Sequence, residues 1–156
     1  MERTIVRIAN ASDCDTIAAN NIAMAWETER LVLDPRTARA GAAHALADPA
    51  RAVYYLAERE GKVAGQMMIT PEWSDWRDAY FWWIQSVYVR PDARGAGVYR
   101  ALHRHVEALA RARADVCGLR LYVEQENRRA QRVYERKGLR RTSYLLFELD
   151  WRRARQ

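Results

Sequence analysis

Residues 85–102 read Q-S-V-Y-V-R-P-D-A-R-G-A-G-V-Y-R-A-L, and this stretch decides the fold. It begins as a β-strand, because β-branched and aromatic residues dominate it as far as Val89. Gly95 and Gly97 then form a turn that opens into an amphipathic helical pattern at Val98. The first turn of a helix offers N–H groups without intrahelical partners, and glycines let an anion approach the backbone. The stretch therefore predicts a strand, a phosphate-binding turn and a helix, in that order.

The turn lacks two common phosphate-loop patterns, G-x-x-x-x-G-K-[ST] and the complete dinucleotide fingerprint with its third glycine. It instead resembles the pyrophosphate loop [QR]-x-x-G-x-[GA] of the GNAT superfamily, the acyl-CoA-dependent N-acyltransferases. Arg94 and Gly97 fit that pattern, whereas Tyr99 stands where the family usually has a small residue. The resemblance implies that acetyl-CoA is bound through its phosphates by Arg94, Gly95, Ala96, Gly97, Val98, Tyr99 and Arg100.

A second stretch, residues 126–139, is similar to the N-x-x-A-x-x-x-Y-x-x-x-G-[FL] segment of the same family. Asn127 and Tyr134 share one helix face, and Gly138 stands where a helix C-cap glycine is expected. The resemblance implies that Asn127 caps its helix and touches the cofactor, that Arg132 reaches its 3′-phosphate or adenine, and that Tyr134 lies beside the thioester sulfur. A phenol with a pKa of about 10 can protonate a leaving thiolate. The alternative for Tyr134 is core packing with its hydroxyl bonded elsewhere.

The remaining elements are predicted from periodicity, caps and turn residues. Strands are predicted at 3–8, 53–58, 62–70, 80–90, 119–123 and 144–149. Helices are predicted at 13 to about 27, at 35–48 and at 98–114, and a fourth helix is predicted to begin at 127. A polar loop is predicted at 71–79. This order predicts an α+β protein, and the resemblance implies the GNAT fold. We expect one domain over residues 1–156, with a frayed tail at 151–156, and a mixed sheet of about six to seven strands with about four helices.

The resemblance also implies a gap in the sheet. In the family, the strand before the phosphate loop and the strand before the last helix splay apart, and the exposed backbone pairs with the pantetheine arm of the cofactor. In this chain the backbone concerned is that of Val87, Tyr88 and Val89.

The general base and the acceptor pocket are less well defined. Many family members have a carboxylate where this chain has Gln85, so the candidate bases are Glu29, Glu72 and Asp75, acting directly or through water. Aromatic residues beside carboxylates suit a cationic amine, so we expect the acceptor to be bound by Trp73, Asp75, Trp76 and Gln85. The alternative is that the neighbouring Trp82 and Trp83 alternate on a strand, so that one packs in the core and the other is buried at a homodimer interface. His103 and His105 are expected at the surface.

Charge is uneven along the chain. Residues 1–78 have 9 Lys and Arg against 12 Asp and Glu, a net −3, whereas residues 79–156 have 17 against 8, a net +9. A basic half can bind nucleic acid or a polyanionic cofactor, or it can be a solvated helix surface. No motif of a nucleic-acid-binding fold accompanies the charge, so nucleic acid is the less favoured partner.

Neither cysteine has a partner at metal-ligand spacing, so Cys14 and Cys117 are expected to be reduced, and no metal is expected. No apolar run reaches the length of a membrane span and no signal-peptide pattern follows Met1, which predicts a cytoplasmic protein that does not enter a membrane.

These observations predict an N-acetyltransferase that transfers the acetyl group of acetyl-CoA to a primary amine by direct attack in a ternary complex. The acceptor, a small-molecule or peptide amine, is not named by the sequence, nor is the acyl-chain preference. Two alternatives remain: a GNAT-fold protein that binds acyl-CoA as a sensor or partner without efficient turnover, and a basic nucleic-acid-binding module.

Overall fold

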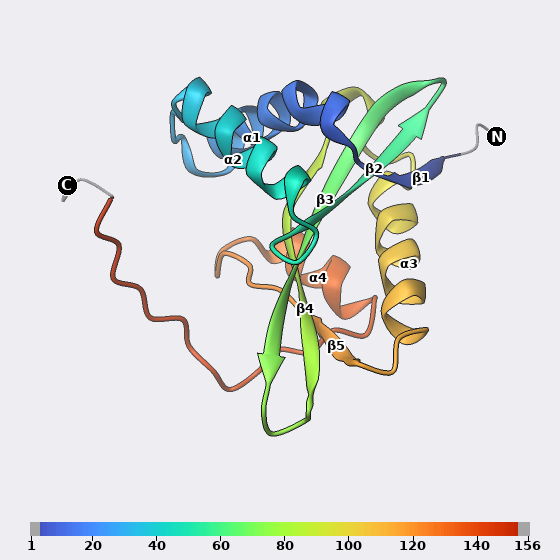
Figure 1. The fold of residues 1–156 in the computed structure, drawn as a ribbon, viewed down its shortest axis with the longest axis vertical. Coiled ribbons are helices and arrows are strands. Elements are labelled where there is room, and N and C mark those ends of the chain that lie inside the picture. Colours follow the sequence, from blue (N-terminus) through green and yellow to red (C-terminus); the bar gives the residue numbers. More distant parts are fainter. Residues whose placement is uncertain (1–3, 153–156) are drawn as a thin grey trace. The chain divides into compact units, whose positions relative to one another are not determined.

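A five-stranded mixed sheet lies at the centre of the first part of the chain (Figure 1). Its strands follow the chain in space as in sequence: β1 (Ile5–Ile8), β2 (Val53–Arg59), β3 (Lys62–Ser74), β4 (Ala79–Val89) and β5 (Val116–Arg120). The first three pairings are antiparallel, and β4 pairs with β5 in parallel. The hairpin of β2 and β3 was predicted at Glu60-Gly61, where both residues have positive φ.

This computed structural model describes residues 4–152, and the chain divides into two units at Leu121 and Tyr122. The first unit contains the sheet, and the second contains helix α4 (Arg128–Glu135). Of the tail that the sequence predicts to be frayed, Trp151 and Arg152 are exposed, and residues 153–156 lie outside the described residues. Within residues 4–152, no helix combines the length and the apolar character that crossing a bilayer requires.

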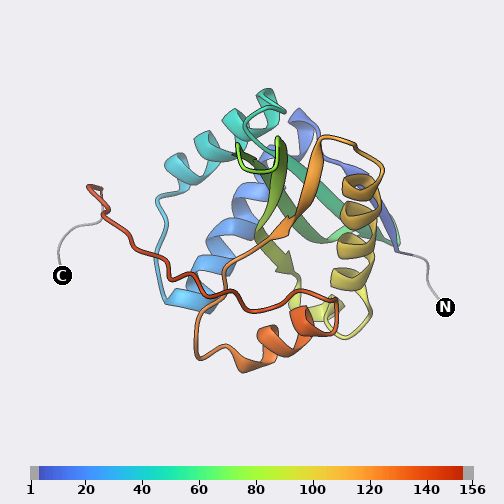
Figure 2. The ribbon, with the colours of Figure 1, turned by 90° about the horizontal axis from the view of Figure 1, so that it is seen from below.

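Two helices cover one face of the sheet of the first unit, and a third covers the other (Figure 2). Helices α1 (Cys14–Glu29) and α2 (Pro35–Ala47) bury small and aliphatic side chains against Tyr54 and Leu56 of β2. Helix α3 (Val98–Arg111) packs on the opposite face, where Leu102 and Val106 join the larger core. The helix starts were predicted from local signals. At α2, for example, Asp34 Oδ2 accepts a hydrogen bond from the Thr37 N–H, and a proline opens the helix.

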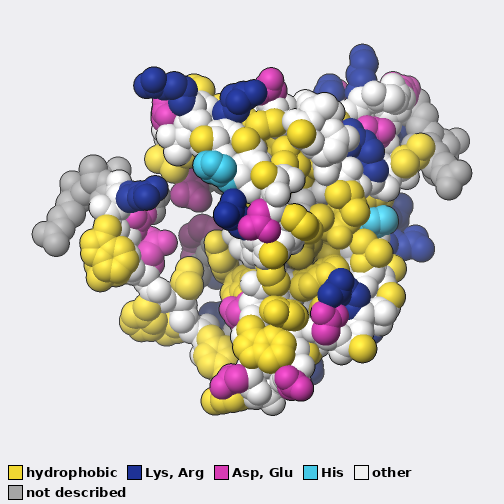
Figure 3. Space-filling view, viewed as in Figure 1, with side chains coloured by type: hydrophobic (Ala, Val, Ile, Leu, Met, Phe, Trp, Pro, Cys, Tyr) yellow, Lys and Arg dark blue, Asp and Glu magenta, His cyan; other side chains and the backbone are white. Residues whose placement is uncertain are grey.

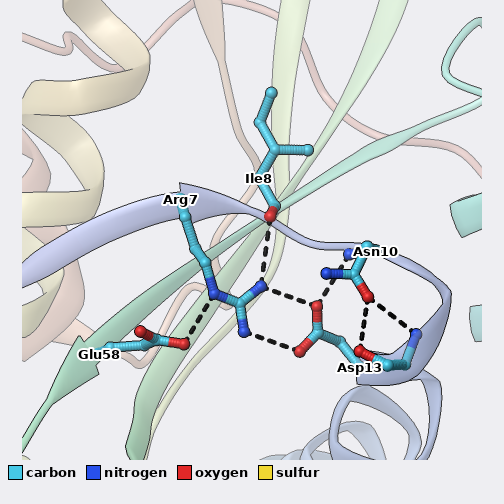
Figure 4. Close-up of polar contacts among 6 residues, drawn as sticks. Arg7, Ile8, Asn10, Asp13 and Glu58 are labelled. Atoms are coloured by element: carbon cyan, nitrogen blue, oxygen red, sulfur yellow. Dashed lines mark hydrogen bonds and ion pairs between the residues drawn. The ribbon is translucent and has the colours of Figure 1, made fainter. Parts of the chain in front are cut away.

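An ion-pair network fixes β1 to the rest of the first unit (Figure 4). The Arg7 guanidinium donates two hydrogen bonds of 2.8 Å to the Asp13 carboxylate in the 3-10 turn η1 (Ala11–Asp13), and its Nε donates to Glu58 of β2 at 2.7 Å. Asp13 in turn accepts from the Asn10 N–H. The hydrogen bonds from Arg7 lower the pKa of the buried Asp13 carboxyl, so this network is ionised at neutral pH.

Three predictions about strands are wrong. The expected loop at 71–79 is mostly strand, because β3 continues to Ser74 and β4 begins at Ala79. Beyond Ile69, β3 pairs only with β4, and a proline such as Pro71 is tolerated on such an edge. The strand expected at 119–123 lies at Val116–Arg120 instead. The strand expected at 144–149 is not formed, so residues 4–152 have five strands rather than six to seven.

The surface prediction for His103 is also wrong, since its side chain is 1% exposed on α3. Its ring lies 5.8 Å from that of Tyr99, between ring centres, and its Nδ1 is 3.7 Å from Glu107 Oε2. His105 is half-buried, edge-on to Tyr55 with ring centres 5.4 Å apart. Helical periodicity alone did not reveal that α3 buries so wide a face.

Candidate active site

The candidate site begins where β4 loses one neighbour. The parallel pairing of β4 with β5 runs only as far as Trp83 opposite Arg120, because β5 ends there. From Ile84 to Val89, no strand within residues 4–121 pairs with β4 on that side. The backbone of this half of β4 therefore has a free edge at the residues that the resemblance assigns to the pantetheine arm, including Val87, Tyr88 and Val89.

A β-bulge marks the same place. Gln66 of β3 pairs with Tyr88 and Met68 pairs with Gln85, so Ser86 and Val87 together lie opposite one residue. Ser86 has a φ of 48°, in the left-handed region that is costly for a residue with a Cβ. A bulge bends its strand and increases the local twist, which gives a physical reason for β4 to leave β5 here.

Buried amides hold this bulge. Gln66 is 0% exposed, and its Nε2 donates to the Ser86 carbonyl at 3.3 Å and to Asn21 Oδ1 at 2.8 Å. Its Oε1 accepts from Asn20 Nδ2 at 3.0 Å, so both ends of the amide are bonded to α1. The sequence analysis missed Gln66. Its only signal was a single polar residue inside the apolar run of β3 from Val63 to Ile69.

The glycine turn joins β4 to α3 in the conformation that the sequence predicts. Gly95 and Gly97 have φ of 80° and 81°, and Gly97 is the N-cap of α3. A Cβ built on Gly95 would meet no atom within 4 Å, so the space beside it is open. The turn and the first turn of α3 therefore present backbone N–H groups and the positive helix end.

Two cations lie against this turn. A Cβ on Gly97 would be 3.2 Å from Nη2 of Arg100, so that guanidinium folds over the glycine. Arg59, at the end of β2, donates from Nη1 to the Ala96 carbonyl at 3.2 Å. Arg100 was a predicted cofactor residue, whereas Arg59 was missed because its distant strand gives no sequence signal for this contact.

Arg94 is anchored rather than free at the turn. Its Nη2 donates to Glu27 of α1 at 2.5 Å, and its Nε donates to the Val89 carbonyl at 3.0 Å. The same Glu27 accepts from the Tyr88 hydroxyl at 3.2 Å. Burial, together with the nearby Glu27 carboxylate, raises the pKa of Tyr88. Arg94 thus ties the glycine turn to α1 and to the end of β4.

Beyond the bulge, β3, β4 and β5 carry a second cluster on the face that α3 does not cover. Glu72 Oε2 accepts from Trp83 Nε1 at 2.8 Å, and its Oε1 accepts from Arg120 Nη1 at 2.6 Å. The Arg120 guanidinium carbon lies 3.6 Å from the centre of the Phe81 ring.

Gln85, one pleat nearer the bulge, donates from Nε2 to Thr70 Oγ1 at 2.6 Å. We call Glu72, Phe81, Trp83, Gln85 and Arg120 the acceptor-face cluster. Arg120 was missed, although it interrupts the apolar residues Leu119 and Leu121.

The structure separates the tryptophans predicted beside Glu72 from this cluster. Trp73 follows Glu72 in a strand, so it lies on the opposite face, edge-on to Tyr80 with ring centres 4.9 Å apart. Trp76 is 85% exposed in the turn of the hairpin, where its N–H donates to Asp75 Oδ1 at 3.0 Å. Figure 3 shows hydrophobic and acidic side chains at this lower end of the molecule. The predicted cage of Glu72 with Trp73 is not formed, because the segment is strand rather than loop.

The candidate site residues of the second unit lie on α4 or at its start. Asn127 Oδ1 accepts from the Ala130 N–H at 3.1 Å, which confirms the cap. Gly138 has a φ of 86°, and its N–H and that of the next residue bond back to Glu135 and Tyr134, a Schellman ending. Arg132 lies in the last turn of α4. Burial raises the pKa of Tyr134, which keeps its hydroxyl protonated at neutral pH.

Glu29, the remaining candidate base, is the last residue of α1 and is exposed. Within the described residues, no three His, Cys, Asp or Glu side chains gather in a way that could hold a metal ion.

The fold is shared with known proteins. The model of the acetyltransferase (GNAT) family matches residues 18–139. A possible acetyltransferase from Clostridium difficile 630 is 36% identical with a TM-score of 0.89, and the match covers 94% of this chain and 97% of that one. No curated protein matches the sequence.

Two more distant structures share the fold. A predicted acetyltransferase from Clostridium acetobutylicum, solved with acetyl-CoA, is 17% identical with a TM-score of 0.74, covering 95% of this chain and 96% of that one. A ribosomal-protein-alanine N-acetyltransferase from Brucella melitensis biovar Abortus 2308 is 18% identical with a TM-score of 0.77, covering 96% and 99%. Because the family model matches most of the sequence and a possible acetyltransferase shares 36% identity over 94% of the chain, the chain belongs to the GNAT family of acetyltransferases.

Proposed function

We propose that this protein is an N-acetyltransferase that transfers the acetyl group of acetyl-CoA to a primary amine by direct attack in a ternary complex. The observation that carries the proposal is the continuity of the free edge of β4, from Ile84 to Val89, with the open glycine turn at the start of α3. This continuity offers hydrogen-bonding backbone to an extended arm and N–H groups to its phosphates.

The residues present fit acetyl-CoA. The open space beside Gly95 and the cations Arg59 and Arg100 suit a pyrophosphate, and the backbone of Val87, on the side of β4 where no strand of the first unit pairs, suits the amides of a pantetheine arm. The acetyl-CoA bound to the related protein from Clostridium acetobutylicum supports the same ligand here. When bound, acetyl-CoA supplies an acyl group that is activated as a thioester. In the second unit, we assign Asn127 and Arg132 to the same ligand.

Tyr134 is the proposed general acid. Its raised pKa leaves the phenol protonated across the neutral range, so its hydroxyl can deliver a proton to the departing sulfur. The absence of a carboxylate at Gln85 means that the incoming amine gives up its proton elsewhere. Glu72, on the same face as Gln85, is the proposed acceptor of that proton, directly or through water.

The acceptor-face cluster favours a cationic amine. Glu72 brings a negative charge, which a cationic amine would share with Arg120, and Trp83 brings an aromatic side chain beside it. Gln85 lies nearest the bulge, and we assign it to hydrogen-bond the reacting nitrogen. Trp73, Asp75 and Trp76 lie farther along the hairpin, so we propose for them a role only with acceptors long enough to reach its end.

Cofactor binding is tested first by thermal unfolding with and without acetyl-CoA. At one hundred times Kd the ligand should stabilise the protein by about 2.7 kcal/mol. Gly97→Glu places a carboxylate in the phosphate site and should lose the shift. Gly41→Glu, which adds the same charge at an open position on α2, should keep it. Wild type without a shift at millimolar acetyl-CoA would contradict the proposal.

Turnover is tested by following release of the CoA thiol with a panel of primary amines. Tyr134→Phe should lower kcat about a hundredfold, the usual contribution of a general acid, while the thermal shift with acetyl-CoA remains. An unchanged kcat would remove Tyr134 from the mechanism.

A second function is supported by one observation. Gln85 replaces the family's common carboxylate, and its amide is held by Thr70, so the site can bind acyl-CoA without an efficient base. A sensor of acyl-CoA would show the thermal shift but no release of CoA with any amine in the panel.

A further inference from the structure

Glu27, near the end of α1, contacts both the glycine turn and the sheet of the first unit. Its Oε2 accepts a hydrogen bond from Arg94 Nη2 at 2.5 Å, and its Oε1 accepts from the Tyr88 hydroxyl at 3.2 Å. The sequence analysis did not single out Glu27, because nothing in the sequence of α1 indicates these two distant contacts. One carboxylate thus joins the turn proposed for the phosphates to the strand that carries the proposed acceptor site.

The bulge of β4 places Tyr88 on the same face of the sheet as Gln85. Their partners on β3 are Gln66 and Met68, which are two residues apart and therefore lie on one face. Without the extra residue in β4, positions 85 and 88 would point to opposite faces. The row of side chains that contains Gln85 therefore continues through Tyr88 to the carboxylate of Glu27.

Arg94 lies where the free edge of β4 meets the glycine turn. The Arg90 N–H donates to the Ala64 carbonyl of β3 at 3.0 Å. The N–H and C=O of a trans peptide point in opposite directions, so the Val89 carbonyl of the same peptide points to the side on which no strand of residues 4–121 pairs with this half of β4. Arg94 Nε donates to that carbonyl at 3.0 Å. A ligand that runs along the free edge to the turn therefore passes the Arg94 guanidinium.

The ion pair of Arg94 with Glu27 is weak enough to be exchanged. The two side chains are 45% and 37% exposed, and an exposed pair of this kind changes an equilibrium by about fivefold or less. A pyrophosphate offers a guanidinium more negative charge than one carboxylate does, and it offers a bidentate site. Once Arg94 turns toward phosphates, the Glu27 carboxylate keeps its hydrogen bond from Tyr88 but no longer has its cation.

We propose that Glu27 holds Arg94 in the unliganded protein and releases it to the phosphates of acetyl-CoA, and that the freed carboxylate then binds the ammonium group of the amine acceptor. This inference rests on the proposed N-acetyltransferase function and adds an order of binding to it. Glu27 carries one cation at a time, first Arg94 and then the amine, so the amine site forms only after the cofactor site is filled. Linkage makes the coupling reciprocal, so the bound amine also strengthens cofactor binding.

The first test measures the affinity of the full-length protein for CoA by calorimetry. Glu27→Gln removes the charge that competes for Arg94, so CoA should bind about threefold to fivefold more tightly than to the wild type. The matched control is Asp92→Asn, which makes the same charge change beside the same turn at a carboxylate that holds Arg90 instead. The control should change the Kd less than about twofold. In an Arg94→Ala background, Glu27→Gln should have no effect.

These measurements separate a failure of the exchange from a failure of the proposed function. Weaker binding of CoA by Glu27→Gln would mean that Glu27 positions Arg94 for the cofactor, and it would overturn the exchange alone. Equal gains in Glu27→Gln and Asp92→Asn, or a gain that persists with Arg94→Ala, would also overturn it. A wild type that does not bind CoA would contradict the proposed function, and the exchange with it.

The second test follows release of the CoA thiol at saturating acetyl-CoA with three primary amines, butylamine, 1,4-diaminobutane and lysinamide. For each amine that the wild type acetylates, Glu27→Gln should raise the KM about tenfold and change kcat less than twofold, because a binding charge is lost and no proton-transfer group is removed. Asp92→Asn should leave the KM for the amine unchanged. An unchanged KM in Glu27→Gln would overturn the amine site at Glu27 while the turnover itself supports the proposed function. A wild type that acetylates none of the three amines would count against both.

Discussion

The two ends of β4 are built in different ways. From Ile84 to Val89 the strand has a bulge, a free backbone edge and buried amide contacts from Gln66. From Tyr80 to Trp83 the strand is paired on both sides, and its half-buried side chains Phe81 and Trp83 contact Arg120 and Glu72. The first end is defined by backbone conformation, and the second by side chains.

This difference explains why the sequence identifies the family of the protein but not the amine that accepts the acetyl group. Backbone geometry at the bulge and the glycine turn depends on a few residues, and we propose that it serves one ligand class. The acceptor-face cluster depends on side chains that can be exchanged without altering the sheet, so the fold does not specify the amine. Four substitutions test whether a change at one end of β4 leaves the stability and the ligand binding of the other end unchanged.

The largest effect is expected at Gly65, opposite Val89 at the cofactor end. A Cβ there would lie 2.8 Å from Val98 Cγ1 and 2.9 Å from the Tyr88 carbonyl oxygen, which is backbone and cannot turn aside. We expect Gly65→Ala to lower the free energy of unfolding, measured with urea, by about 3 kcal/mol. Gly41→Ala, at an open position in α2, should raise it by about 0.5–1 kcal/mol. Equal effects would contradict the close packing of α3 on β3.

The second largest loss of stability is expected from Gln66→Leu. It leaves the amides of Asn20 and Asn21 without their partner and frees the Ser86 carbonyl, at an expected cost of about 2 kcal/mol. Because the bulge shapes the cofactor edge, the KM for acetyl-CoA should rise about fivefold to tenfold. Steady-state kinetics with Gln85→Leu provides the contrast, since that variant should raise the KM for the amine instead. If Gln66→Leu changed stability alone, the amide would be structural only.

Glu72→Gln tests the other end with a smaller effect on stability. The pair with Arg120 is half-exposed, so the loss in free energy of unfolding should stay below about 1 kcal/mol. The KM for a cationic amine should rise about tenfold, because a charge is lost beside Trp83, with the KM for acetyl-CoA unchanged. Asp75→Asn makes the same charge change in the hairpin turn. If the KM for the amine rose as much in Asp75→Asn, the effect of Glu72→Gln would be a general effect of charge rather than the loss of a specific amine contact.

The smallest effect is a pH dependence at the cofactor end. The pKa of Tyr88 is raised in the folded protein, mainly by burial and then by Glu27. Its contribution to stability is therefore fully present below the unfolded pKa of about 10, and it is lost as the pH rises through the folded pKa. Between pH 8 and 11, the free energy of unfolding measured with urea should fall less steeply in Tyr88→Phe than in the wild type. Identical profiles would mean that this hydroxyl is not buried as described.

Local signals were sufficient where the structure is local. The capped starts of α2 and α4, the glycine turn at Gly97 and the ending at Gly138 were all predicted, because each depends on residues within one or two helical turns. The family resemblance rested on the same stretches, and the family match confirms it. The predicted loop at residues 71–79 is confirmed only at residues 75–78, the turn of the hairpin. Polar and proline residues favoured a loop at 71–74, but pairing with β4 forms a strand there.

The sequence by itself determined the fold class, the glycine turn and the family, since these follow from short motifs whose chemistry needs particular residues at fixed spacing. The tertiary structure alone decided which distant side chains meet: Gln66 with Ser86, Arg94 with Glu27, and Arg120 with Glu72. It also placed Glu72 and Trp73 on opposite faces. The reason is physical, because a strand's pairing partner and register are set by burial across the whole sheet rather than by the strand's own residues.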